Sequence, residues 1–156
     1  GALGHGFPVA VGLALAAKKS QSRRRIFLIT GDGELAEGSN WEAALAAAHY
    51  GLDNLVIIND KNNLQLAGPT REIMNTDPLA EKWLAFGMQV TECQGNDMAS
   101  VVATLEELKQ EGKPNVVIAH TTKGAGISFI QGRAEWHHRV PKGDEIEQAL
   151  EELKDA

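Results

Sequence analysis

The stretch RIFLITGDG, residues 25–33, decides the fold because a short apolar run ends abruptly in glycine and aspartate. Residues 25–30 are mostly β-branched or aromatic, and such runs suit a strand that is buried on both faces of a sheet. Gly31-Asp32-Gly33 then stops the strand with residues that are common in turns. The pattern predicts an interior strand with Asp32 at its carboxyl end.

Three further strands are expected downstream, and helical segments separate them. The strands are predicted at residues 54–59, 88–93 and 115–119. The helices are predicted at residues 7–19, at 39–50 with Ser39 or Asn40 as its cap, from Asp77-Pro78 onward, from Asp97 to about Glu111, and from Asp144 to Lys154. Residues 121–142 are glycine-rich and are predicted to be irregular. Strands that alternate with helices predict an α/β fold, with a parallel sheet covered by helices on both faces.

The composition indicates one globular domain that handles small molecules. The chain has 156 residues, of which 43% are hydrophobic, and both values are ordinary for a single soluble domain. Its 21 acidic and 15 basic residues give a net charge of −6, and no basic stripe favours nucleic acid. No apolar run approaches the ~20 residues of a membrane span. Cys93 is the single cysteine, which fits a reducing compartment, so we expect a cytoplasmic protein.

The first six residues, GALGHG, form a glycine-rich stretch without an initiator methionine. A glycine-rich loop is an unusual place for a domain to begin. We therefore expect residues 1–156 to be one domain from which an upstream part is missing.

Polar residues follow the first two strong strands. Asp32 ends the first of them, and Asp60-Lys61-Asn62-Asn63 follows the second. In a parallel sheet, ligands sit beyond the carboxyl ends of the strands, so Asp32 and Asn62 can face each other there. A carboxylate oxygen and an amide oxygen are both hard ligands of the kind that Mg²⁺ takes together with phosphate and water. Each element alone also reads as an ordinary turn, but their order and the 28 residues between Gly33 and Asn62 are more specific.

GDG followed by NN at this interval resembles the thiamine diphosphate motif. Within that superfamily, GDGELAEGSNWEAALAAAHYGLDNLVIINDKNNLQLAGPT, residues 31–70, is similar to transketolase, as are GALGHGFPVAVGLALAAK and HTTKGAGISF. The resemblance runs from Gly1 to about Pro141, and it is closest to the amino-terminal subunits of split bacterial transketolases. Deoxyxylulose-phosphate synthase and the 2-oxo-acid dehydrogenases share GDG but look less similar around EGSNWEA.

The resemblance implies a thiamine diphosphate-binding fold and assigns the cofactor residues by position. Asp32, the Asn62 side chain and the Leu64 carbonyl would bind Mg²⁺, and Asn62 would also stand beside the cofactor. Gly33 would approach the diphosphate. Gly1, Ala2 and Leu3 match the family's glycine-rich loop against the cofactor, although the family often has proline or serine where Ala2 stands.

Two further residues receive catalytic roles from the resemblance. Glu37 matches an acidic residue that contacts the partner half and helps to link paired active sites; without the resemblance it reads as a solvated carboxylate at a helix start. His137 matches a histidine near the diphosphate and the sugar. His138 beside it leaves open which imidazole faces the cofactor, and a surface histidine pair is the alternative.

The implied activity is transfer of a two-carbon ketol unit from a ketose to an aldose, with sugar phosphates as the expected substrates. The family's pyrimidine-binding domain, which supplies a glutamate to the cofactor, is absent from this chain. We therefore expect a carboxy-terminal partner chain, an oligomer with sites between chains, and no turnover by this chain alone. The alternatives are another thiamine diphosphate enzyme and a non-catalytic assembly subunit. A nicotinamide-binding loop is disfavoured because GDGELA lacks the third glycine of GxGxxG.

Overall fold

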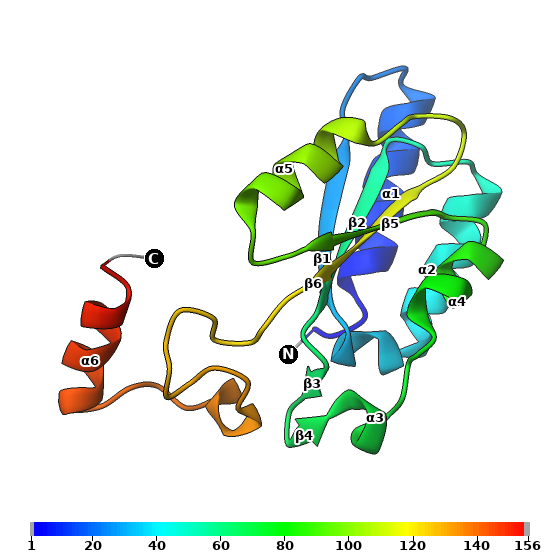
Figure 1. Ribbon diagram of the computed structural model, residues 1–156. Coiled ribbons are helices and arrows are strands. Elements are labelled where there is room, and N and C mark those ends of the chain that lie inside the picture. The colour runs from blue at the N-terminus through cyan, green and yellow to red at the C-terminus, as the bar shows by residue number, and fades with distance from the viewer. Residues whose placement is uncertain (1, 155–156) are drawn as a thin grey trace.

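The computed structural model describes residues 2–154 and contains a four-stranded parallel sheet (Figure 1). Its strands are β1 (Ile26–Gly31), β2 (Leu55–Lys61), β5 (Gln89–Gln94) and β6 (Asn115–His120). They lie in the order β1-β2-β6-β5, so all four predicted strands are confirmed and the fold is of the predicted α/β class. β1 and β5 are the edges of this sheet.

Three helices cover one face of the sheet and enclose the main hydrophobic core. They are α1 (Gly6–Lys19), α2 (Gly38–His49) and α4 (Leu79–Ala85). Phe7 of α1 and Trp83 of α4 are fully buried there, with ring centroids 6.1 Å apart. The sheet contributes alternate residues to this core, among them Leu55, Ile57, Val116 and Ile118. The burial of these large side chains supplies most of the driving force for this half of the fold.

The opposite face is covered only in part. Helix α5 (Met98–Glu107) lies over β5 and β6, where Val56, Val117 and other small apolar side chains form a second cluster. Phe27 and Ile29 point to the same face from β1 but remain 50% and 71% exposed. The prediction that residues 25–30 form a strand buried on both faces is therefore wrong, because β1 is an edge strand and α5 does not reach it.

Helix ends follow the sequence signals unevenly. Asp97 caps α5 as predicted, accepting a hydrogen bond from the Ala99 N–H at 2.9 Å, but the helix ends at Glu107 rather than near Glu111. Neither Ser39 nor Asn40 caps α2, because both lie inside the helix. Their side chains instead donate hydrogen bonds to the carbonyls of Gly4 and Glu34, respectively, which tie the helix start to neighbouring loops.

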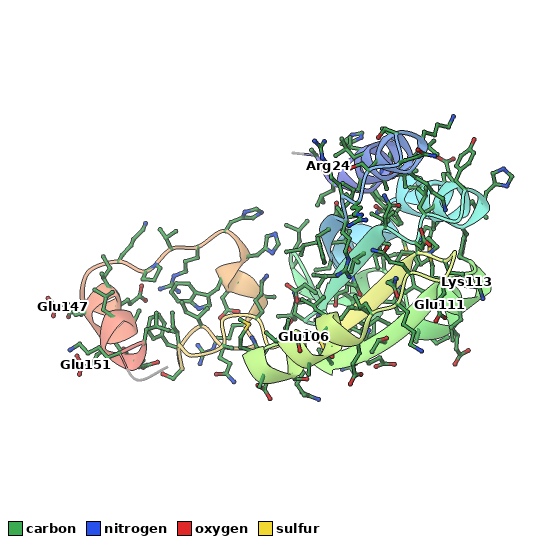
Figure 2. The ribbon with its side chains drawn as sticks, turned by 90° about the horizontal axis from the view of Figure 1, so that it is seen from above. Arg24, Glu106, Glu111, Lys113, Glu147 and Glu151 are labelled. Atoms are coloured by element: carbon green, nitrogen blue, oxygen red, sulfur yellow. The ribbon has the colours of Figure 1, made fainter. Side chains whose placement is uncertain are left out.

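Several short elements lie at the carboxyl edge of the sheet and were not predicted. They are η1 (Gly33–Ala36), β3 (Leu64–Gln65), β4 (Gly68–Pro69), α3 (Thr70–Ile73) and η2 (Ala134–His137). The final helix α6 (Asp144–Glu152) and the irregular segment before it extend away from the sheet in both views, and Figure 2 labels Glu147 and Glu151 on this helix. Among residues 2–154, no helix is long and apolar enough to cross a membrane.

Candidate cofactor site

The carboxyl ends of β1 and β2 meet at one edge of the sheet. The two strands are parallel neighbours, with Gly31 of β1 opposite Asp60 of β2. The Asp32 N–H donates a hydrogen bond of 3.1 Å to the Asp60 carbonyl, which continues the ladder by one residue. The register therefore brings Asp32 beside the loop that follows β2, as the sequence predicts.

Asp32 is a buried carboxylate that two backbone groups hold in place. Its side chain is at the N-cap of η1, and the residue is only 1% exposed. One oxygen accepts from the Gly33 N–H at 2.8 Å, and the other accepts from the Asn63 N–H at 2.6 Å. Burial raises the pKa of Asp32, while these two bonds and the Lys61 charge lower it and the Asp60 charge raises it further. Desolvation dominates, so a cation beside this carboxylate would lower the cost of its charge.

The loop after β2 is ordered by its own side chains. The Asn62 amide oxygen accepts from the Leu64 N–H at 3.0 Å, and Asn63 adopts a positive φ of 61°. The chain then turns back through the small β3–β4 pair. An amide oxygen has two lone pairs, so Asn62 can still accept a further bond or bind a cation.

A cavity of about 490 Å³ lies between these two tips. It brings together predicted residues that are far apart in the sequence: Leu3, Asp32, Gly33, Asn62, Leu64, His137 and His138. Lys123 also lines it and so places a cation at the cavity wall. Ala2 is exposed and is not among the lining residues, and Gly1 lies outside the described part of the chain.

Gly33 has no room for a side chain. A Cβ atom at this position would lie 2.9 Å from the Cγ atom of Gln65 and 3.0 Å from its Cβ. The glycine is therefore required by packing within the protein itself. The same absence of a side chain lets the backbone approach a ligand in the cavity.

Both candidate histidines reach the cavity. His137 and His138 are exposed, and their ring planes are nearly perpendicular with centroids 4.6 Å apart. Desolvation, Lys123 and His138 together lower the pKa of His137, which favours a neutral imidazole at pH 7. The geometry does not choose between the two rings.

Glu37 stands apart from this group. It is exposed at the N-cap of α2 and is not among the residues that line the cavity. Its proposed contact with a partner half stays a prediction.

Three further residues, Glu34, Asp60 and Gln65, line the cavity without having been predicted to do so. Asp60 could have been found, since it follows the apolar part of β2 directly. Gln65 becomes a neighbour of Gly33 only through the tertiary fold.

The donor set of the cavity fits a hard divalent cation. Among residues 2–154, there is no group of three or more histidine, cysteine or acidic side chains arranged to hold a metal. Asp32, Asn62 and Leu64 offer instead one carboxylate, one amide oxygen and one backbone carbonyl. Mg²⁺ uses few protein ligands of this kind and fills its remaining positions with phosphate oxygens and water.

Comparison with protein families gives a match over nearly the whole chain. The model of the transketolase thiamine diphosphate binding domain matches residues 1–154. The chain belongs to the transketolase family. Within this family, the chain is similar to proteins that are named as single subunits of transketolases split into separate chains.

Three similar family members carry specific names. A protein of Actinobacillus succinogenes, named as a subunit of apulose-4-phosphate transketolase, is 75% identical over 99% of this chain and 56% of its own length. The corresponding protein from Phocaeicola vulgatus is 44% identical with the same coverage. A 6-deoxy-6-sulfo-D-fructose transketolase subunit of a Clostridium species is 39% identical, again over 99% of this chain and 56% of its own length. The chain thus spans about half the length of the curated transketolase subunits that it matches.

Solved transketolases have the same fold. The structure of the Campylobacter jejuni transketolase superposes with a TM-score of 0.89 at 33% identity, over 97% of this chain and 25% of that one. A Pichia stipitis transketolase superposes with a TM-score of 0.86 at 30% identity, over 94% of this chain and 23% of the other. The four-stranded sheet is therefore part of a transketolase thiamine diphosphate-binding domain.

Proposed function

We propose that this chain is the diphosphate-binding part of a split transketolase, which transfers a two-carbon ketol unit between phosphorylated sugars together with a pyrimidine-domain partner. The observation that carries the proposal is the pairing of the buried Asp32 carboxylate with the Asn62 loop inside one cavity of a transketolase-family domain. This pairing supplies the oxygen ligands for a cation beside a glycine backbone that a diphosphate can approach.

Each residue of the cavity has a binding or positioning role in this proposal. Asp32, Asn62 and the Leu64 carbonyl would hold Mg²⁺, and Gly33 and Lys123 would contact the diphosphate. Thiamine diphosphate, when bound, supplies the nucleophilic carbon and the electron sink that ketol transfer needs. His137 or His138 would donate a hydrogen bond to a phosphate or sugar oxygen, which a neutral imidazole can do through its single N–H.

The partner and the substrate follow from the named relatives. Their names designate each of them as one subunit, which implies a second chain, and the expected partner carries the pyrimidine-binding domain. The relatives' names include a sugar phosphate and a sugar sulfonate, and both substrates bear an anionic group. We propose a phosphorylated ketose as the donor for this chain, because the relative at 75% identity is named for a sugar phosphate.

The test combines the purified chain with its candidate partner, thiamine diphosphate, Mg²⁺ and a phosphorylated ketose, and follows transfer of the two-carbon unit to an aldose. We expect turnover from the mixture and none from either chain alone. Robust turnover by this chain alone would refute the need for a partner.

Two controls separate the alternatives. Release of carbon dioxide from pyruvate with formation of a deoxyketose phosphate would identify a deoxyxylulose-phosphate synthase instead. Calorimetry with thiamine diphosphate, in the presence and absence of Mg²⁺, identifies a non-catalytic assembly subunit if the assembled complex binds no cofactor.

A further inference from the structure

One carboxylate joins the glycine-rich loop to the tip of β1. Glu34 lies in η1, two residues after Asp32, and it lines the cofactor cavity. One of its oxygens accepts a hydrogen bond of 2.9 Å from the Gly4 N–H, and the other accepts one of 3.3 Å from the Gly31 N–H. The first bond spans 30 residues of sequence, so it connects two segments that would otherwise be independent loops.

Gly4 is held from its other side as well. Its carbonyl accepts a hydrogen bond of 2.9 Å from the Ser39 hydroxyl. Its φ is +78°, and a Cβ atom there would lie 2.6 Å from the Ser39 hydroxyl oxygen and 2.9 Å from the Glu37 Cβ. Gly4 therefore occupies a notch that only glycine fits, and the preceding residue, Leu3, forms part of the cavity wall.

An acidic side chain in a cavity for an anionic cofactor needs a structural reason, since its charge repels a diphosphate. Glu34 has one, because both of its oxygens are directed at backbone N–H groups. A carboxylate offers acceptors at both oxygens, whereas an amide offers only one and presents an NH₂ group to the other N–H. Glutamine is therefore a close steric substitute that cannot make both bonds.

We propose that Glu34 is a positioning residue that fixes the loop of residues 2–5 against the tip of β1, so that the cofactor cavity is formed before thiamine diphosphate binds. This inference rests on the proposed function for the identity of the ligand. A loop that is already ordered loses less conformational freedom when the ligand binds, so the anchor increases affinity for the cofactor without taking part in the chemistry.

The test compares Glu34→Gln with Glu42→Gln. Glu42 is exposed on α2 and makes no hydrogen bond or ion pair in the described part of the chain, so it is a matched control. Amide hydrogen exchange of the cofactor-free chain should show at least ~10-fold faster exchange at Gly4 in Glu34→Gln and no change in Glu42→Gln. In the assembled enzyme with Mg²⁺, the dissociation constant for thiamine diphosphate should rise about 10-fold in Glu34→Gln, with kcat at saturating cofactor unchanged.

Three results would overturn the inference. Unchanged exchange at Gly4 removes the anchor, and faster exchange with an unchanged dissociation constant removes its effect on the cofactor. A fall in kcat at saturating cofactor would assign Glu34 to the chemistry.

If Glu34→Gln does not fold, Ser39→Ala takes its place, because it removes the bond to the Gly4 carbonyl and leaves the carboxylate intact. If the wild-type assembly binds no thiamine diphosphate, the proposed function and the cofactor half of this inference both fail. The exchange experiment needs no cofactor and still decides whether Glu34 anchors the loop.

Discussion

The two walls of the cofactor cavity are built in different ways. The wall at the strand tips is buried and tightly hydrogen-bonded, with Asp32 only 1% exposed and fixed by two backbone N–H groups. The opposite wall belongs to residues 121–142, and its two histidines are exposed. The difference indicates that the fold preforms the cation-binding half of the site and leaves the substrate-facing half accessible to a partner.

The second wall still has an anchor of its own. Trp136 is buried between the ring of Phe129, at a centroid distance of 5.3 Å, and the guanidinium of Arg139, at 4.1 Å from the ring. The Ser128 hydroxyl donates to Glu152 of α6 at 2.8 Å. These contacts hold the histidine segment to α6 rather than to the sheet, so a substitution in one wall should leave the other largely unaffected.

Removal of the buried carboxylate gives the largest expected effect. Asp32→Ala deletes a cation ligand and leaves the N–H groups of Gly33 and Asn63 without their acceptor. We expect Mg²⁺-dependent binding of thiamine diphosphate by the assembled enzyme to weaken by ~100-fold or more, measured by calorimetry. Asp97→Ala, which removes a helix cap far from the cavity, is the control for a general loss of stability. Cofactor binding within threefold of the wild type would contradict the role of Asp32.

Asn62→Ala tests the second tip and should have a smaller effect. It removes an amide ligand and the bond to the Leu64 N–H, but it leaves the charged ligand in place. We expect Mg²⁺-dependent cofactor binding to weaken by ~10-fold to 100-fold, with little change in melting temperature. The neighbouring substitution Asn63→Gly is the control, because Asn63 has a positive φ that glycine adopts readily and contacts Asp32 only through its backbone. Equal losses in both variants would indicate that loop shape, rather than the Asn62 oxygen, matters.

The strand tips were predictable because parallel topology converts sequence order into position. Apolar runs predict the strands, and the residue directly after each run must lie at the carboxyl edge, which places Asp32 and Asn62 without further information. The same logic failed for the outer face of β1. A local run of apolar residues carries no information about whether a helix covers it, and Phe27 and Ile29 are exposed because α5 packs elsewhere.

Glu34 and Gln65 show the other limit of sequence reasoning. The partners of Glu34 lie 30 residues and 3 residues away, and neither bond leaves a periodic signal in the sequence. Ser39 was predicted as a helix cap because serine at that position is typical of one, but its hydroxyl bonds Gly4 instead. Long-range polar contacts of this kind depend on the packed structure and appear only with it.

Substitution of the exposed wall should change catalysis and spare cofactor binding. His137→Ala or His138→Ala removes one hydrogen-bond donor from a side chain that packs little within the chain. We expect the residue that faces the substrate to lower kcat/KM by ~10-fold or more, and the other to have less than a threefold effect, while Mg²⁺ affinity is unchanged in both. Ketol-transfer kinetics of the assembled enzyme decide between the two histidines. A large loss of Mg²⁺ affinity in either variant would break the separation between the walls.

The smallest expected effect is a pH dependence of stability that originates in Asp32. Burial raises the pKa of Asp32 above 3.8, so in the cation-free protein the folded state holds this proton more tightly than the unfolded state does. The carboxylate therefore lowers the free energy of unfolding as pH rises from about 3.8 through the raised value, and the full penalty is present above it. Urea unfolding in a chelator should show this decrease in the wild type, and a smaller one in Asp32→Asn, which carries no charge there. Added Mg²⁺ should restore wild-type stability above the raised pKa and leave Asp32→Asn almost unchanged, because the cation offsets a charge that only the wild type has. An equal gain in both proteins would place the Mg²⁺ ion away from the strand tips.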